Sequence, residues 1–306
     1  MAECLVTGGA GFIGSATCDL LIEKGYSVAI VDDMSTGKRE NLNPRATLYE
    51  VDIRDASLKE VFEKEKPRYI VHTAAQIDVR KSIAKPGYDA SINVSGTINL
   101  LECARKYGTE KLVYSSSGGA VYGEPDANPV AEGHKIMPLC PYGASKYCGE
   151  KYIEMYGATH GLRYNIMRYG NVYGPRQDPL GEAGVIAIFS KKIAEGVAPV
   201  IFGDGEQTRD FCFVADIAAA NVAGIEKEGE SHIYNVGTGA PTSVNEVASQ
   251  LIEAFGSDVK PAYSEAIPGE VRHIYLDIGR IRDELGWKPG TDMNQGIKMT
   301  KRWLDG

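Results

Sequence analysis

Short apolar runs alternate with longer segments of helical periodicity through the first half of this 306-residue chain. The short runs are rich in Val, Ile, Leu and Tyr, as buried strands are, whereas the longer segments repeat apolar residues on one helical face. This pattern predicts strands at 4–6, 27–31, 48–51, 69–72, 111–114 and 164–168, and helices at 12–24, 57–64, 91–107 and 142–160. Strands spaced by helices predict a doubly wound α/β fold, in which a parallel sheet carries helices on both faces.

The pattern changes beyond Asn171, where glycine and proline become frequent and the apolar runs are more scattered. There we predict strands at 200–202 and 211–214 and helices at 243–255 and 279–285. We therefore expect a first domain over 1–170, to which segments near 210–240 return, and a second, smaller α/β domain over 171–306. Because no repeat or low-complexity linker separates them, the two parts are expected to share a cleft.

Composition narrows the class of protein. The formal net charge of -8 argues against nucleic acid or an anionic membrane as the main partner. No apolar run approaches the roughly 20 residues of a membrane span, and the N-terminus enters a strand directly instead of resembling a secretion signal. The six cysteines are scattered without a C-x-x-C pair. We expect free, mostly buried thiols in a reducing cytoplasm and no metal site.

A glycine-rich turn separates the first predicted strand from the first predicted helix. Gly8, Gly11 and Gly14 have the spacing G-x-x-G-x-x-G, close to the G-x-G-x-x-G fingerprint of dinucleotide-binding folds. Such a turn lets the backbone approach a pyrophosphate, which is then held by the first amides of the helix, here near Phe12 and Ile13. The turn predicts a Rossmann fold over the first domain.

An acidic pair, Asp32 and Asp33, ends the second predicted strand. An acid about 20 residues after the glycines binds the hydroxyls of an adenosine ribose. Because it also repels the 2′-phosphate of NADP, this position predicts NAD as the cofactor.

A tyrosine and a lysine four residues apart, Tyr142 and Lys146, share one face of a predicted helix. Tyrosine has a pKa near 10, so it is a poor base at neutral pH unless a nearby cation favours its phenolate. A second pair, Tyr147 and Lys151, lies about 140° around the same helix, so only one pair can face a ligand. Pro141 places Tyr142 at the helix start, which favours the first pair as the catalytic one.

A run of serines follows Tyr114, where we predict that a strand ends. Ligands in open α/β sheets bind at the carboxyl ends of the strands. A serine there could hydrogen-bond a substrate hydroxyl and share its proton with Tyr142, whereas the other serines would serve in turns. The residues alone do not distinguish among Ser115, Ser116 and Ser117.

These features together resemble the extended short-chain dehydrogenase/reductases, and within them most closely the UDP-glucose 4-epimerases. The resemblance rests on 7–14, Asp32, the serines before 121–123, the Tyr142-x-x-x-Lys146 motif and the segment 168–177, and it continues to 285–287. It implies an NAD-dependent enzyme that inverts C4 of a UDP-hexose through a transient 4-keto sugar, with UDP-glucose and UDP-galactose as substrates. Tyr142 would act as base and acid at the 4-hydroxyl, and Lys146 would hold the nicotinamide ribose and lower the tyrosine pKa. The serine run would supply the hydroxyl partner, with Ser117 as the first candidate and Ser116 as the second.

The resemblance implies a fuller set of contacts, which includes the residues already named and adds others. On the cofactor side they are Gly8, Gly11, Phe12, Ile13, Gly14, Asp32, Asp33, Thr36, Gly37, Asp52, Ile53, Ala74, Ala75, Gln76, Asn93, Tyr142, Lys146 and Tyr169. On the sugar-nucleotide side they are Ser117 and Tyr142 of the first domain and, in 171–306, which would be the sugar-nucleotide-binding domain, Asn171, Val200, Phe202, Arg209 and Glu270. One position departs from the family pattern, because Ile267 stands where relatives commonly carry a phosphate-binding arginine; Arg272 could replace it only if the loop runs differently.

Alternative functions are weighed against the same residues. Sugar-nucleotide 4,6-dehydratases and UDP-glucuronate decarboxylases often carry an acid just after the active-site Ser or Thr, where this chain has glycines and Ala120. Epimerisation of UDP-GlcNAc or UDP-glucuronate is a closer alternative, because Gly170 and Ile274 leave room for a larger sugar. A non-catalytic NAD-binding sensor would not need both Tyr142 and Lys146.

A homodimer is expected from the resemblance, through a four-helix interface formed by the helices at 91–107 and 142–160. The sequence offers one physical argument for it. Tyr147, Cys148, Ile153 and Tyr156 form more apolar surface than packing on one sheet requires.

Overall fold

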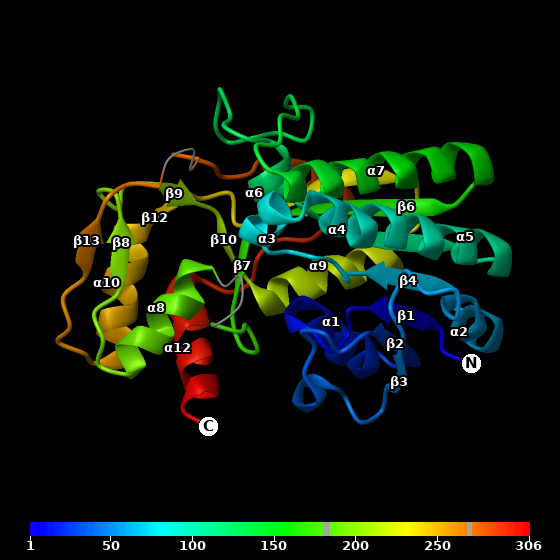
Figure 1. Cartoon of the computed structure of the whole chain (residues 1–306), viewed down its shortest axis with the longest axis horizontal. Coiled ribbons are helices and arrows are strands. Elements are labelled where there is room, and N and C mark those ends of the chain that lie inside the picture. Colours follow the sequence, from blue (N-terminus) through cyan, green and yellow to red (C-terminus); the bar gives the residue numbers. More distant parts are fainter. Residues whose placement is uncertain (180–183, 268–270) are drawn as a thin grey trace.

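The computed structural model describes residues 1–179, 184–267 and 271–306, and a seven-stranded parallel sheet forms its centre (Figure 1). The order across the sheet is β11-β6-β5-β4-β1-β2-β3, and every neighbouring pair is parallel. The strands are β1 (Cys4–Thr7), β2 (Val28–Asp32), β3 (Thr47–Glu50), β4 (Tyr69–His72), β5 (Lys111–Ser117), β6 (Arg163–Tyr169) and β11 (His232–Val236). This arrangement confirms the predicted doubly wound, Rossmann-like α/β fold.

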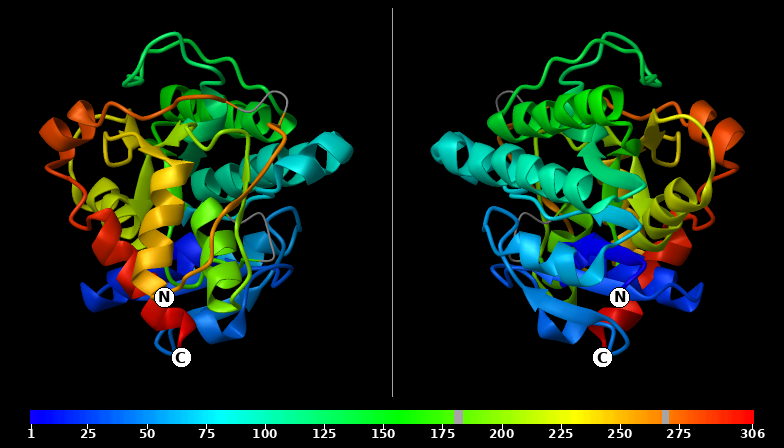
Figure 2. Two further views of the ribbon diagram at one scale, coloured as in Figure 1. Left: turned by 90° about the vertical axis from the view of Figure 1, so that its left-hand side faces the viewer. Right: turned by 90° about the vertical axis from the view of Figure 1, so that its right-hand side faces the viewer.

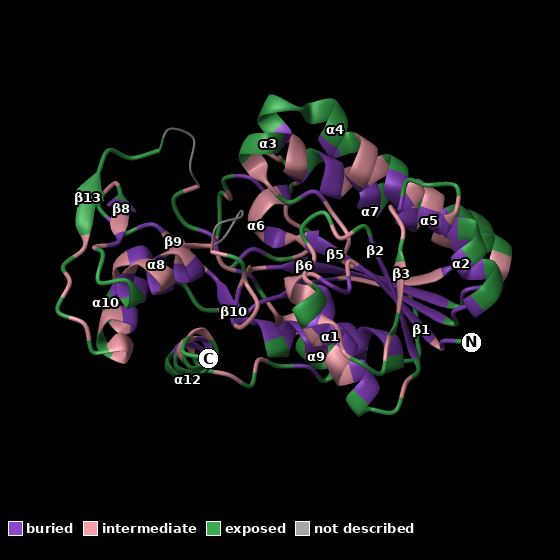
Figure 3. Cartoon of the chain, turned by 60° about the horizontal axis from the view of Figure 1, so that its bottom comes forward, coloured by how far each residue is buried: buried purple, intermediate pink, exposed green. Residues whose placement is uncertain are grey.

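The chain reverses direction across the sheet between β1 and β4. It runs from β1 through β2 to β3 on one side and then crosses to β4 on the other side of β1. Such a switch point opens a space beyond the carboxyl ends of the two central strands, where ligands bind in this class of fold. β1, β2 and β4 are buried along their whole length, as strands covered on both faces are (Figure 3).

Helices cover both faces of the sheet (Figures 1 and 2). On one face, α1 (Phe12–Glu23), α9 (Val214–Glu226) and α11 (Gly279–Leu285) pack on a core that includes Cys4 and Val6 of β1. On the other face, α2 (Leu58–Glu65), α5 (Thr97–Tyr107) and α7 (Pro141–His160) pack on a core that includes Leu5. Alternate residues of one strand thus feed two cores, as the period of a strand requires.

Short elements connect this framework. The 3-10 turn η1 (Arg39–Asn41) follows β2, and the short α6 (Gly118–Val121) follows β5. Between β4 and α5 lie α3 (Val79–Ala84), α4 (Pro86–Ala90) and the π-helical turn η2 (Ser91–Gly96). Because η2 runs directly into α5, the helix predicted at 91–107 is continuous but begins with a π turn.

A third core lies on the left of Figure 1. Its elements are β7 (Asn171–Tyr173), α8 (Val185–Ala194), β8 (Val200–Phe202), β9 (Thr208–Arg209), β10 (Phe211–Phe213), β12 (Thr242–Ser243), α10 (Val244–Phe255), β13 (Ala262–Ser264) and α12 (Met293–Leu304). The strands pair in twos, β10 with β7, β12 with β9 and β13 with β8. Phe189, Ile201, Phe211, Leu251 and Ile297 are among the buried side chains that hold these elements together.

The structure corrects several predicted elements. β5 does not end at Tyr114, because Ser115 to Ser117 continue the ladder beside β6. The strand predicted at 211–214 ends at Phe213, and Val214 begins α9, which the sequence pattern missed. α9 is buried along most of its length, so it lacks the polar face that makes a helix recognisable. α8, α12 and β11 were also missed.

The physical argument for an apolar outer face on α7 was wrong. Ile153 is 0 % exposed and Tyr156 is 5 % exposed, and both pack into the core between α7 and the sheet. Tyr147 and Cys148 are half-buried. These apolar side chains of α7 therefore pack mainly in the chain's own core and not against a partner.

Candidate active site

The glycine turn brings the start of α1 against the ends of β1 and β4. Gly8 has φ +70°, and a Cβ added to it would lie 2.7 Å from the backbone nitrogen of Ala74. A Cβ on Gly14 would lie 2.1 Å from the carbonyl oxygen of Gly8. Gly11 is the N-cap of α1 and has no side chain to bind the first amides of the helix. The turn is thus a close-packed cradle whose helix amides suit a pyrophosphate.

The carboxylate of Asp32 is fixed beside this turn. Its Oδ2 accepts a hydrogen bond from the Ala10 amide and its Oδ1 from the Met34 amide, both at 2.9 Å. Burial raises the pKa of Asp32, and the two amide bonds oppose that shift. Gly37 packs closely on the carboxylate, since a Cβ there would lie 2.6 Å from Oδ1. These residues fit an adenosine ribose.

The other residues predicted on the cofactor side differ in their exposure. Asp33 accepts from Ser35 in an exposed turn, and Thr36 is exposed. Asp52 pairs with Arg54, which lowers its pKa, and Ile53 is buried. The residues after β4 are the half-buried Ala74 and Ala75 and the buried Gln76, whose backbone amide donates to Asn93 Oδ1.

Tyr169 does not present its side chain to the strand ends. Its hydroxyl is buried between β5 and α9, where it hydrogen-bonds Ser115 and donates to Asn221. The alternation of side chains along β6 turns it toward the face that α1 and α9 cover. The contact predicted between Tyr169 and the cofactor would therefore be made by the backbone of Tyr169.

Tyr142 lies in the first turn of α7. Cys140 is the N-cap of that helix, and the amide of Tyr142 donates to Ser82 Oγ of α3 at 3.2 Å. Burial raises the pKa of the phenol to about 12, and a hydrogen bond with the side chain of Ser117 opposes the shift. The serine that reaches Tyr142 is therefore Ser117, the first candidate from the sequence.

Ser116 faces elsewhere, so its assignment as the second catalytic candidate was wrong. Its hydroxyl donates to Glu150 Oε1 at 2.5 Å, on the face of the sheet covered by α7. Ser115 points to the opposite face and bonds Tyr169. Because side chains alternate along β5, Ser115 and Ser116 face opposite sides of the sheet, whereas Ser117 ends the strand beside Tyr142.

Lys146 is buried one helical turn after Tyr142. Its Nζ atom lies 4.3 Å from the centroid of the Tyr114 ring, a cation–π contact. Burial lowers the pKa of Lys146 to about 7, whereas Glu150 and Asp89 raise it. The predicted lowering of the Tyr142 pKa by Lys146 is not what this structure shows, because burial of the phenol is the largest effect on that group.

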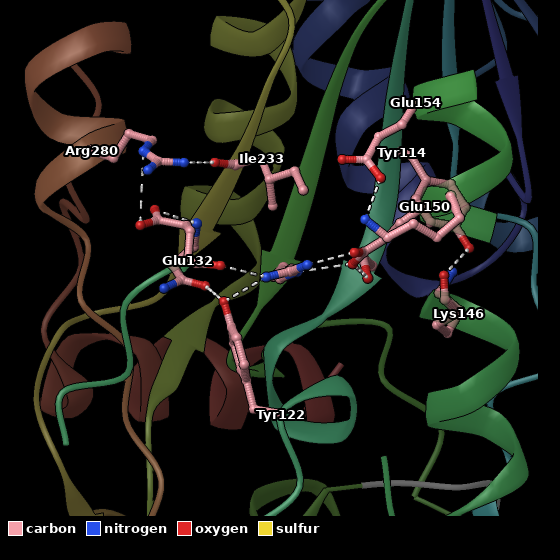
Figure 4. Close-up of polar contacts among 12 residues, drawn as sticks. Tyr114, Tyr122, Glu132, Lys146, Glu150, Glu154, Ile233 and Arg280 are labelled. Atoms are coloured by element: carbon pink, nitrogen blue, oxygen red, sulfur yellow. Dashed lines mark hydrogen bonds and ion pairs between the residues drawn. The ribbon is translucent and has the colours of Figure 1, made fainter. Parts of the chain in front are cut away.

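A buried ion pair that the sequence did not predict lies beneath this helix (Figure 4). Arg168 of β6 donates to both carboxylate oxygens of Glu150, at 3.0 and 2.6 Å, and neither side chain is more than 2 % exposed. Arg168 also donates to the Tyr122 hydroxyl at 3.0 Å and to the Glu132 carbonyl. The pair connects α7 to the long segment between α6 and α7. The only indication of this pair in the sequence is that Glu150 lies one helical turn after Lys146.

Besides Ser117 and Tyr142, four of the residues predicted on the sugar-nucleotide side lie on β7, β8 and β9. Asn171 lies close to Gly119, where an added Cβ would be 3.6 Å from its Oδ1. Arg209 donates to the Thr208 carbonyl at 2.9 Å. Val200 is half-buried and Phe202 is exposed. Glu270 lies outside the described residues.

Arg272 does not take the place of the phosphate-binding arginine in this structure. Its guanidinium forms a two-fold ion pair with Asp204, at 2.8 and 2.7 Å, on an exposed surface. Ile267, which stands at the position where relatives commonly carry that arginine, is half exposed.

Comparison with known proteins places the chain in a family. The model of the NAD dependent epimerase/dehydratase family matches residues 4–237. The chain belongs to this family. It is 51% identical over 300 residues to a putative UDP-glucose 4-epimerase of Methanocaldococcus jannaschii, covering 98% of this chain and 97% of the relative.

Two solved structures extend the likeness to three dimensions. The UDP-glucose 4-epimerase of Thermotoga maritima with UDP-glucose superimposes with a TM-score of 0.96 at 44% identity, covering 99% of this chain and 98% of that one. The UDP-glucose 4-epimerase of Thermus thermophilus in complex with NAD gives a TM-score of 0.93 at 39% identity, covering 99% of both chains. The chain is thus an epimerase-type member of the extended short-chain dehydrogenase/reductases.

Residues 1–179, 184–267 and 271–306 also bear on membrane insertion and metal binding. In these ranges no helix is both long and apolar enough to cross a membrane. The same ranges contain no group of three or more His, Cys, Asp and Glu side chains arranged to hold a metal ion.

Proposed function

We propose that this protein is an NAD-dependent epimerase that inverts C4 of a UDP-hexose and interconverts UDP-glucose and UDP-galactose. The observation that carries the proposal is the contact between Ser117 and Tyr142, one helical turn from Lys146, at the carboxyl edge of the sheet. The similar UDP-glucose 4-epimerases from three organisms support the choice of substrate.

The cofactor is NAD. The cradle of Gly8, Gly11 and Gly14 would hold its pyrophosphate, and the fixed carboxylate of Asp32 its adenosine ribose. When bound, NAD supplies a reversible acceptor for the hydride on C4 of the sugar. The geometry of the turn fits this group, because only glycine allows the start of α1 to approach the β1 turn so closely.

Tyr142 is the group that moves the proton of the sugar 4-hydroxyl. Ser117 lies beside the phenol and would hydrogen-bond both it and the sugar hydroxyl, so that one proton is shared among three oxygens. A phenol with a pKa of about 12 is a weak base at neutral pH, so its activation requires a positive charge nearby. Lys146 carries that charge on the same helix face.

The 4-keto sugar can be reduced on its other face because the protein keeps it bound between the two hydride transfers. The proposed contacts to the UDP group are Asn171, Val200, Phe202, Arg209 and Glu270. A guanidinium such as that of Arg209 suits paired phosphate oxygens, and a UDP group so anchored leaves the hexose free to turn.

We extend the proposal to domains and assembly. The first domain would comprise 1–170 with returning segments near 210–240, and the second 171–306; the separate core around Phe189 and Leu251 supports this division. A homodimer in the cytoplasm is proposed from the family likeness. The exposed Ile83, Tyr88 and Met155 on α3, α4 and α7 support a partner surface there. Light scattering at micromolar concentration tests it, and a monomer would exclude it.

A conversion assay tests the substrate. The purified protein is incubated with UDP-glucose, UDP-GlcNAc or UDP-glucuronate, and the configuration at C4 is read by NMR. We expect UDP-glucose to equilibrate with UDP-galactose. Conversion of one of the larger sugars alone would move the assignment to that sugar, and conversion of none would refute the proposal.

A further inference from the structure

A buried carboxylate that the sequence analysis did not single out lies on α4, beside the helix that carries Tyr142 and Lys146. Asp89 is 1 % exposed. Its Oδ1 atom accepts hydrogen bonds from the side-chain amides of Gln76, at 2.8 Å, and Asn93, at 3.2 Å. Its Oδ2 atom is buried, and no described residue hydrogen-bonds it. An enclosed carboxylate oxygen without a partner is unfavourable unless a nearby positive charge compensates it.

The groups that hold Asp89 also hold the start of α7. The amide of Asn93 that donates to Asp89 donates to Ser145 Oγ at 3.0 Å as well. Ser145 in turn donates to the carbonyl of Tyr142 at 3.0 Å. The position of the carboxylate is thus tied through three hydrogen bonds to Tyr142 in the first turn of the active-site helix.

Five titratable groups face Lys146, from four elements. They are His72 of β4, Asp89 of α4, Tyr114 of β5, and Tyr142 and Glu150 of α7 itself. His72 and Tyr114 are neutral near pH 7, because burial lowers the pKa of His72 to about 3 and raises that of Tyr114. The anionic groups facing the ammonium are therefore Asp89 and Glu150.

Only one of these two carboxylates is still available to balance Lys146. Both oxygens of Glu150 bond Arg168, so that this charge is already neutralised inside the protein. Asp89 forms no ion pair with a described Lys or Arg. The four buried charges sum to zero when Glu150 is counted with Arg168 and Asp89 with Lys146.

We propose that Asp89 is a positioning residue that supplies the counter-charge of Lys146 and keeps its ammonium group protonated for the reaction at Tyr142. The inference deepens the proposed function and rests on it, because Lys146 is the group through which Asp89 acts. The helix α4, which carries Asp89, and the turn η2, which carries Asn93, would then contribute to the reaction as well as to packing. Gln76 and Asn93 orient the carboxylate, and its unpartnered oxygen supplies the field.

Asp89→Asn tests the proposal while sparing the hydrogen bonds. The amide oxygen of Asn accepts from Gln76 and Asn93, but the charge is removed. The pKa of Lys146 is measured by NMR titration of protein with isotopically labelled lysine, its signal being assigned by its loss in Lys146→Met. We expect the pKa of Lys146 to fall by about one pH unit, a tenfold change in its protonation equilibrium. An unchanged pKa overturns the proposal.

Glu154→Gln is the matched control. Glu154 is a carboxylate on α7, the helix that carries Lys146, and it pairs with Lys151 at the surface. It is expected to leave the pKa of Lys146 unchanged. A shift equal to that of Asp89→Asn would mean that any carboxylate of the helix acts alike, which also overturns the proposal.

A double-mutant cycle gives a second readout. The unfolding equilibrium is measured for wild type, Asp89→Asn, Lys146→Met and the double variant. We expect Asp89→Asn to destabilise the protein about tenfold more when Lys146 is present than when it is replaced. Equal effects in both backgrounds would mean that Asp89 contributes to stability only through its hydrogen bonds with Gln76 and Asn93. That result would overturn the proposal.

The double-mutant cycle still tests the proposal if the single variant Asp89→Asn does not fold. If Asp89→Asn alone is unfolded, the double variant, which lacks both charges, is expected to fold, and failure of both overturns the proposal. Neither readout uses a UDP-sugar. A protein that shows the coupling but converts no UDP-sugar therefore refutes the proposed function and leaves the role of Asp89 standing.

Discussion

The side chain of Ser117 lies beside the phenol of Tyr142, where the end of β5 meets the start of α7, and it opposes the rise of the phenol's pKa. The two residues meet because β5 continues three residues beyond its apolar run and because Cys140 and Pro141 begin α7 at the same edge of the sheet. The neighbouring Ser116 bonds Glu150 on a different face. Adjacent serines thus serve different purposes.

This contrast gives a paired prediction. Ser117→Ala is expected to lower kcat by about 10- to 100-fold, because a group that shares the transferred proton is lost. Ser116→Ala is expected to change kcat little and to lower the free energy of unfolding by about 1–3 kcal/mol, because a buried oxygen of Glu150 loses one of its two donors and keeps only Arg168. Steady-state kinetics and urea unfolding separate the two. Equal losses of kcat would contradict the assignment of Ser117.

The glycine turn makes a prediction about cofactor binding. Gly14→Ala places a methyl group 2.1 Å from the Gly8 carbonyl oxygen, so the turn must open, and we expect weaker NAD binding together with a loss of about 1–3 kcal/mol of stability. Gly87→Ala is the control, because a Cβ at Gly87 of α4 meets no atom within 4 Å. Calorimetric titration with NAD measures both; unchanged affinity in Gly14→Ala would exclude the turn as the cofactor site.

His72 predicts a sensitivity to acid. Burial, followed by the charge of Lys146, lowers its pKa from 6.5 to about 3. Between these values the unfolded chain binds a proton that the folded protein does not, so stability falls as the pH falls, at up to about 1.4 kcal/mol per pH unit.

The variant His72→Gln removes this titration. It is expected to be less stable near pH 7, where it loses bonds to Thr7 and Thr97, but to show a flatter dependence of the unfolding free energy on pH between about 6.5 and 3. His160→Gln, at the exposed end of α7, should keep the wild-type slope. The same slope in all three proteins would show that other groups govern acid unfolding.

The ion pair between Glu150 and Arg168 predicts a large loss of stability. Glu150→Gln leaves the buried Arg168 without its counter-charge, and we expect a cost of about 3–5 kcal/mol in urea unfolding. Glu154→Gln breaks the exposed pair with Lys151 and should cost at most about 1 kcal/mol. A cost below about 1 kcal/mol for the buried pair would contradict the burial of its charge.

Local features of the sequence were enough to predict the framework of the sheet. The apolar runs at β1, β2 and β4 identify buried strands, since strands covered on both faces need little else. The glycines at 8, 11 and 14 and the spacing of Tyr142 and Lys146 identify the cofactor turn and the catalytic helix, because each is a short-range pattern. α9 was missed for the opposite reason, since a helix buried on nearly all sides has no polar face to mark its period.

The arrangement around the catalytic pair could not be predicted, because it depends on contacts between distant segments. Nothing local distinguishes Ser117 from Ser116 until the end of β5 is known. Asp89 faces Lys146 only because α4 packs beside α7. Ile153 was misjudged for the same reason, since the core it enters belongs to another part of the chain.

The account depends most on Tyr142 acting on a sugar held beside NAD. The most direct measurement adds UDP-galactose to the NAD-loaded protein and follows both the near-ultraviolet absorbance of reduced nicotinamide and the configuration at C4. We predict transient reduction and conversion to UDP-glucose in wild type and in Tyr147→Phe, and neither in Tyr142→Phe, which should still bind NAD. Full conversion by Tyr142→Phe, or no conversion by the wild type, would contradict it.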